Sequence, residues 1–185
     1  MLQVGEYTII NNQICKKIDE TEFKPVNTFD YPIGKKQKGE LRKIAKTANI
    51  ALADWTLDFS DFKTSVSRCL IHLKNDWNAN IVKSPLFNNA RIRFDGDSFR
   101  HFYYSGRNAR SMRELELRAK CLPYLRNIIE KSGVKACCSV ENGQLGFVIM
   151  GRAKIGGKDT AIKVIIAKKK KDKLYYLSVN NLGEI

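Results

Sequence analysis

The C-terminal part of the chain, from residue 134 onwards, constrains the fold most because it reads as strands joined by short turns. Apolar and polar residues alternate there and β-branched residues are frequent, which is typical of strands with one buried face. The dipeptides Asn142-Gly143 and Gly156-Gly157 separate these stretches and favour tight hairpin turns. The pattern therefore predicts a four-stranded antiparallel meander, with strands at residues 134–140, 145–155, 160–167 and 174–180.

The preceding residues carry helical signals that could cover this sheet. Apolar spacing and capping residues predict helices over residues 35–53, 60–73, 97–102 and 111–131. Asp97 is expected to cap the third helix, and Pro123 is expected to kink the fourth. Weak alternation around Asn11-Asn12 predicts an N-terminal hairpin. The expected fold class is α+β: N-terminal helices and a hairpin, then a helix packed on a four-stranded antiparallel sheet.

The charge of the chain indicates the class of its partner. Among 185 residues, 33 are lysine or arginine and 19 are aspartate or glutamate, which gives a net charge of +14. The 43% of hydrophobic residues can form a buried core, so this charge does not indicate a disordered chain. Cations that neutralise phosphates release counterions and bind nucleic acid whatever its sequence. The composition therefore favours a polyanionic partner, although a basic surface that serves only solubility is the simpler alternative.

The sequence also bears on where the protein is located and on whether it holds disulfides, metals or cofactors. No apolar run approaches the roughly 18 residues of a membrane helix, and the N-terminus lacks a signal-peptide pattern. We therefore expect a cytoplasmic protein without membrane contact. Five cysteines without CxxC spacing and two histidines predict reduced thiols, with neither a disulfide framework nor a zinc site. Asp95 and Asp97 lack the further carboxylates that divalent metals need, so no metal or other cofactor is expected.

Period-two alternation sorts the strand residues into two faces. The face expected to pack on the helix is mostly apolar and holds Phe147, Ile149, Ala153, Ile155, Ile162, Val164, Ile166, Tyr175, Leu177 and Val179. The opposite face is expected to be exposed and to hold Arg152, Lys154, Lys163, Tyr176, Ser178 and Asn180. Every charge in this second set is positive, with hydroxyl and amide groups beside it. Such a surface suits phosphate oxygens, although a polar outer face is also ordinary in an antiparallel sheet.

A run of arginines precedes the sheet. It comprises Arg91, Arg93, Arg100, Arg107, Arg110, Arg113 and Arg118, and the planar guanidinium binds phosphate through two hydrogen bonds. Aromatic residues lie among these arginines, and the bases of a single strand could stack on Tyr103 or Tyr104, whereas Phe99 and Phe102 are better explained as core residues. His101 is the one histidine in this basic environment, although a lone histidine is more often structural than catalytic.

Residues 81–185 resemble the barnase/EndoU/colicin/RelE-like ribonuclease superfamily, in particular the variants of phage polyvalent proteins and bacterial toxin tips. The resemblance rests on a histidine in a helical segment (SFRHF, residues 98–102), a helix rich in leucine with a proline (ELRAKCLPYLRNIIE, 116–130) and the strand motifs GRAKI (151–155) and LSVN (177–180). It implies that residues 76–185 form a ribonuclease-like α+β domain behind an N-terminal extension, residues 1–75, of unknown role. A second histidine, which some branches use, is absent from residues 76–185.

The resemblance implies metal-independent cleavage of RNA, in which a 2'-hydroxyl attacks the adjacent phosphate to give a 2',3'-cyclic phosphate. His101 would transfer the proton, Arg152 and Lys154 would stabilise the charge on the phosphorane, and Ser178 would donate a hydrogen bond to a phosphate oxygen. RNA, with transfer RNA among the candidates, would be positioned by Tyr104, Arg107, Arg110, Lys163, Tyr176 and Asn180.

A toxin-like ribonuclease implies restraint by an acidic immunity protein or antitoxin, and it could be delivered into a target cell. Two readings without catalysis stay open at this stage. The first is a basic module that binds RNA or DNA through the same sheet. The second is a phage-type interaction protein whose basic face meets an acidic partner.

Overall fold

A large sheet organises the protein, whose computed structural model describes residues 4, 7–10, 13–25, 35–56, 62–105, 107–141, 144–169 and 173–185. Its long strands are consecutive in the chain and pair antiparallel with their neighbours: β9 (Val134–Glu141), β10 (Gln144–Ile155), β11 (Lys158–Lys168) and β12 (Leu174–Glu184). Three short strands extend it: β4 (Ile50–Ala51), β5 (Val82–Ser84) and β6 (Ala90–Arg93). The sheet therefore has seven strands, and β4 and β6 pair parallel to β10 and β12.

The expected sheet was too small because β4 and β5, with two and three residues, leave almost no alternation to detect, and because residues 90–94, which read as a short strand, were not assigned to the sheet. Residues 50–51 were expected within a helix, yet α1 (Lys35–Ala45) ends at Ala45 and the chain then joins the sheet as β4. Two smaller sheets accompany the main one. β1 (Tyr7–Ile10), β2 (Gln13–Lys17) and β3 (Phe23–Pro25) form the first, and β7 (Tyr104–Ser105) with β8 (Asn108–Ala109) forms the second. Asn11-Asn12, the expected hairpin turn, lies outside the described residues.

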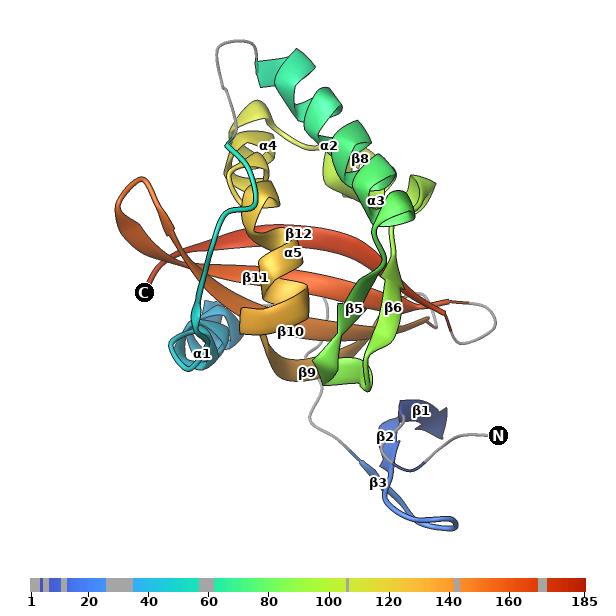
Figure 1. Ribbon diagram of the computed structural model, residues 1–185. Helices are drawn as coiled ribbons and strands as arrows, with labels where there is room; N and C mark the ends of the chain where they lie inside the picture. Colours follow the sequence, from blue (N-terminus) through green and yellow to red (C-terminus); the bar gives the residue numbers. More distant parts are fainter. Residues whose placement is uncertain are drawn as a thin grey trace.

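Helices cover both faces of the sheet (Figure 1). One face is covered by α2 (Phe62–Ala79), α3 (Gly96–Tyr103), α4 (Met112–Ala119) and α5 (Leu125–Asn127). The predicted helix over residues 111–131 is not continuous. A 3-10 turn, η2 (Leu122–Tyr124), interrupts it at Pro123, and its last turn, η3 (Ile128–Ser132), is π-helical. A further 3-10 turn, η1 (Pro85–Phe87), joins β5 to β6.

Much of the second face is buried instead of exposed, which corrects the expectation of an open basic sheet. α1 packs there through Leu41 and Ala45 onto Val148, Met150 and other apolar residues of the strands. Each of the two long central strands carries apolar residues on both sides, a pattern that belongs to strands covered on both faces. The alternation correctly places Phe147, Ile162 and Val164 beneath the helices, but it does not reveal the second cover.

A register shift in β12 moves its aromatic residues. Ile165 pairs with Ser178 whereas Ile166 pairs with Tyr176, so Leu177 is the extra residue of a β-bulge. Because a bulge interrupts the alternation, Tyr176, which we expected on the outer face, lies in the core with 1% of its surface exposed. Tyr175, expected in the core, is half-buried instead.

Candidate functional site

The α4 helix brings a buried guanidinium against β12. Ser111 caps the helix by accepting a hydrogen bond from the Glu114 amide at 3.2 Å. Leu115 and Ala119 anchor the helix in the core, and Arg118, with 4% of its surface exposed, lies between α4 and the strand. Its Nη1 donates to Ser178 Oγ at 3.0 Å and its Nη2 donates to Asn180 Oδ1. Ser178, a predicted catalytic residue, and Asn180, a predicted RNA ligand, are thus already hydrogen-bonded within the protein.

A chain of polar contacts continues from Arg118 to the histidine helix. Glu114 Oε1 lies 3.5 Å from Arg118 Nε and also accepts a hydrogen bond from Arg110. Arg110 Nε in turn donates to the main-chain carbonyl of His101 at 3.4 Å. The structure therefore connects His101, Arg110, Ser178 and Asn180 through Arg118 and Glu114. The i,i+4 spacing of residues 110, 114 and 118 could have indicated Glu114 from the sequence.

The α3 helix, which carries His101, is fixed at its first turn. Its cap is Asp95, not Asp97 as expected from the sequence: Asp95 accepts hydrogen bonds from the amides of Asp97 and Ser98 at 3.0 and 3.3 Å. Ser98 is buried, and its hydroxyl donates to the Tyr176 carbonyl at 2.6 Å. His101 is half-buried and follows Ser98 by three residues, less than one helical turn, in the C-terminal half of the helix. The anchor thus sets the position of the histidine relative to β12.

Lys169 forms ion pairs with two aspartates at the start of α3. Its Nζ lies 2.6 Å from a carboxylate oxygen of both Asp95 and Asp97, and 4.7 Å from the ring centre of Tyr175. The hydrogen bond and the charge of Lys169 hold the pKa of Asp97 below its usual value. Burial disfavours the charged form of Lys169, but the hydrogen bonds that Lys169 donates to the two carboxylates, together with their negative charges, outweigh this effect and raise the pKa of the ammonium.

Three exposed arginines lie on the part of the chain that runs from the C-terminal half of α3 to the first turn of α4. We call residues 100–113 the arginine-rich segment. The acidic side chains around it are engaged: Asp97 with Lys169, Glu114 with Arg110 and Arg118, and Glu116 with Lys120. Exposed arginines are Arg100, Arg107 and Arg113, and the structure shows no ion pair for them among the residues it describes. Tyr104, 46% exposed, lies on the same segment.

The remaining predicted residues lie elsewhere. Arg152 forms an ion pair with Asp159, and Lys154 is exposed close to the β10–β11 turn. Lys154 follows Met150 by four residues, and Met150 lies in register with Lys163, the partner of Asn180. At about 3.3 Å per residue, Lys154 is therefore about 13 Å further along the strands than Asn180.

Two of the predicted RNA ligands are inaccessible. Lys163 is 5% exposed and shares the α1 side of the sheet with its pairing partner, Met150. Tyr176 packs between Phe94 and Trp77 in the core, and burial raises the pKa of its hydroxyl. Because Lys154 lies far along the strands from Asn180 and Arg152 is paired with Asp159, the structure does not bring Arg152 and Lys154 together with Ser178 around one phosphate.

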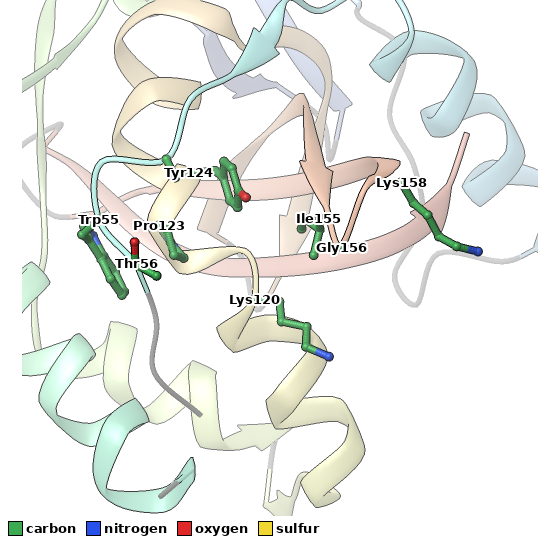
Figure 2. A pocket seen from close by; sticks show the side chains of 9 residues that line it. Trp55, Thr56, Lys120, Pro123, Tyr124, Ile155, Gly156 and Lys158 are labelled. Carbon is green, nitrogen blue, oxygen red and sulfur yellow. The ribbon is translucent and has the colours of Figure 1, made fainter. Parts of the chain in front are cut away.

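A pocket of about 500 Å³ lies at the β10–β11 end of the sheet (Figure 2). It is formed by residues that follow β4, by the end of α4 with η2, and by the β10–β11 turn. Its lining is Ala53, Trp55, Thr56, Lys120, Pro123, Tyr124, Ile155, Gly156 and Lys158. Both turn glycines have positive φ, and a side chain at Gly156 would be strained there.

Within the described part of the chain, no three His, Cys, Asp or Glu side chains gather closely enough to hold a metal ion. Every helix in those same residues is too short or too polar to cross a membrane.

Comparison with models of known protein families found no match. Searches of the curated proteins and of the solved structures found no match either.

Proposed function

We propose that the protein binds single-stranded RNA through the arginine-rich segment. The observation that carries this proposal is the exposure of Arg100, Arg107 and Arg113 on the same segment as the exposed Tyr104, while the neighbouring carboxylates are engaged with other cations. Guanidinium groups without a carboxylate partner can bind phosphates without first breaking an ion pair. An exposed tyrosine among them offers a flat surface on which a base can stack. The buried contacts of Arg110 and Arg118 hold the elements beneath this surface in place.

The salt dependence of binding tests this proposal. Replacing Arg100, Arg107 and Arg113 by glutamine should reduce the slope of log K against log salt by about 2, since each phosphate contact to a single strand contributes about 0.7. The matched control changes Lys38, Lys43 and Lys46, which are exposed around α1, to glutamine and so removes the same charge. An equal loss of affinity in both variants would mean that net charge alone attracts the RNA, and it would refute the proposal.

The same titration separates RNA from an acidic protein partner. We compare single-stranded RNA with polyglutamate of the same number of charges, using wild type and Tyr104→Ala. Stacking predicts tighter binding of RNA and a loss of about fivefold or more for RNA alone in Tyr104→Ala. Equal affinities for the two polyanions, unchanged in the variant, would favour the acidic protein.

A second candidate is metal-independent ribonuclease activity at this surface, which the position of His101 on the same segment favours. A 2'-hydroxyl of the bound strand would attack the adjacent phosphorus, and the bond from phosphorus to the 5'-oxygen would break. His101 would act as general base, taking the proton of the 2'-hydroxyl, or as general acid, giving a proton to the departing 5'-oxygen, with water serving the other oxygen. Arginines of the segment would take the charge-stabilising role first expected of Arg152 and Lys154.

Incubation with total cellular RNA in EDTA tests the ribonuclease candidate. Wild type should produce fragments with 2',3'-cyclic phosphate ends, and His101→Ala should reduce the rate by about 100-fold or more. The matched control is Asn75→Ala, since Asn75 is exposed on α2 outside both the arginine-rich segment and the pocket. Binding without cleavage by wild type would leave the RNA-binding proposal and reject the catalytic one.

A further inference from the structure

The pocket at the β10–β11 end of the sheet has an aromatic part and a cationic part. Figure 2 shows Trp55 at one end, Pro123 and Tyr124 in the middle, and the side chains of Lys120 and Lys158 towards the other side. Its volume of about 500 Å³ falls within the roughly 300–1,000 Å³ of small-molecule sites. A ligand that fits both parts must have a flat apolar group at one end and a negative charge at the other.

The aromatic walls are held by contacts outside the pocket. The ring of His72 packs edge-on against Trp55 with the ring centres 6.2 Å apart. The amide of Asp54, next to Trp55, donates to the Pro123 carbonyl at 2.8 Å, and the hydroxyl of Tyr124 donates to the Lys154 carbonyl at 3.0 Å. These bonds join three separate parts of the chain. The walls are therefore positioned before any ligand arrives, which lowers the entropic cost of binding.

The two lysines carry charge that a phosphate can use. Lys120 Nζ lies 2.6 Å from Glu116, and Lys158 Nζ lies 2.9 Å from Glu184. The side chains of the second pair are 69% and 61% exposed. Exposed ion pairs of this kind contribute little free energy and exchange readily. A phosphate at the lysine end can therefore replace the carboxylates at small cost.

We propose that this pocket binds a nucleotide, with its base stacked on Trp55 and its phosphate between Lys120 and Lys158. A base is the flat group that stacks on tryptophan, and a phosphate accepts several hydrogen bonds from ammonium groups. The nucleotide could be free or part of an RNA strand, because the chemistry recognised is the same. The site is separate from the arginine-rich segment and does not depend on the function proposed for that surface.

Tryptophan fluorescence provides a direct readout. The chain has two tryptophans, and Trp77 is only 1% exposed, so quenching by a ligand reports on Trp55. We titrate adenosine 5'-monophosphate, adenosine and a short single-stranded RNA. Adenosine 5'-monophosphate should quench the signal and bind about fivefold or more tightly than adenosine. Lys158→Gln should weaken the monophosphate about two- to fivefold, whereas Glu184→Gln should tighten it about twofold by removing the competing carboxylate.

Control variants keep the result interpretable. Trp55→Phe should lose the quenching yet retain calorimetric binding, because phenylalanine preserves the stacking surface; Trp55→Ala should lose about tenfold or more in affinity. The Arg100, Arg107 and Arg113 variant should bind the monophosphate as wild type does, which separates this site from the RNA surface. Quenching by the RNA alone would assign the nucleotide to a strand. Absence of both quenching and heat with every ligand, or equal affinity for adenosine and its monophosphate, would overturn the proposal.

Discussion

Arg118 provides the most demanding test of the architecture, since its guanidinium is buried between α4 and β12. We consider Arg118→Met, which keeps the length and apolar stem of the side chain and removes its charge and hydrogen bonds. The variant leaves Ser178 Oγ and Asn180 Oδ1 without the donors that they have in the wild type. Glu114 loses one of its two arginine neighbours and keeps Arg110.

The expected cost follows from these contacts. A hydrogen bond that involves a charged group contributes about 1.5–3 kcal/mol, so two such bonds contribute about 3–6 kcal/mol. Removing the charge also removes the cost of burying it, which returns part of this free energy. We therefore expect Arg118→Met to lower the free energy of unfolding by about 2–4 kcal/mol. For a chain of this size, the melting temperature should fall by roughly 5–15 °C.

Urea denaturation at neutral pH measures this effect, provided that the slope of the transition is unchanged. Arg113→Met is the matched control, because Arg113 lies on the same helix but is exposed, and its replacement should cost less than about 0.5 kcal/mol. A double-mutant cycle with Asn180→Ala should show a coupling of about 1–2 kcal/mol. Equal midpoints for Arg118→Met and Arg113→Met would show that the buried arginine does not hold α4 on the sheet.

Two further predictions concern other parts of the fold. Gly133→Ala should destabilise the protein by about 2 kcal/mol or more, because a Cβ at this position would lie 2.4 Å from the main-chain oxygen of Ile128; Gly96→Ala, with open space around it, is the control. Lys169→Met should reduce the loss of stability on acidification below about pH 4. The pKa of Asp97 is lower in the folded protein than its usual value of 3.8, so its interaction with Lys169 stabilises the folded state at pH values above 3.8. This contribution disappears as the pH falls through the folded-state pKa. Urea midpoints at pH 3 and pH 7 measure it, and an unchanged difference would contradict the assignment.

The two proposed ligand surfaces differ in how they recognise phosphate. The arginine-rich segment presents exposed guanidinium groups and suits a long polyanion, whose binding weakens steeply with salt. The pocket beside Trp55 offers stacking and two ammonium groups, so it suits one nucleotide, whose binding depends less on salt. Measurements at two salt concentrations therefore distinguish the surfaces without any substitution.

Local patterns in the sequence determined several features by themselves. Period-two alternation and glycine turns located the strands now seen as β9 to β12, because a strand with one apolar side repeats every two residues. The positive charge of the chain and the arginines between residues 91 and 118 are equally local properties. Arg110, Glu114 and Arg118 also follow i,i+4 spacing, which favours ion pairs among them but does not indicate their contacts with His101 or β12.

Only the tertiary structure decided which of these charges face the solvent. Alternation separates two sides of a strand but does not say whether a distant helix covers the second side, so Lys163 was expected on a surface that α1 closes. The bulge at Leu177 moves Tyr176 into the core, and a single extra residue leaves no periodic signal. The pocket depends on Trp55, Tyr124 and Lys158 meeting from three separate segments. Such contacts arise from long-range packing, which local sequence patterns do not encode.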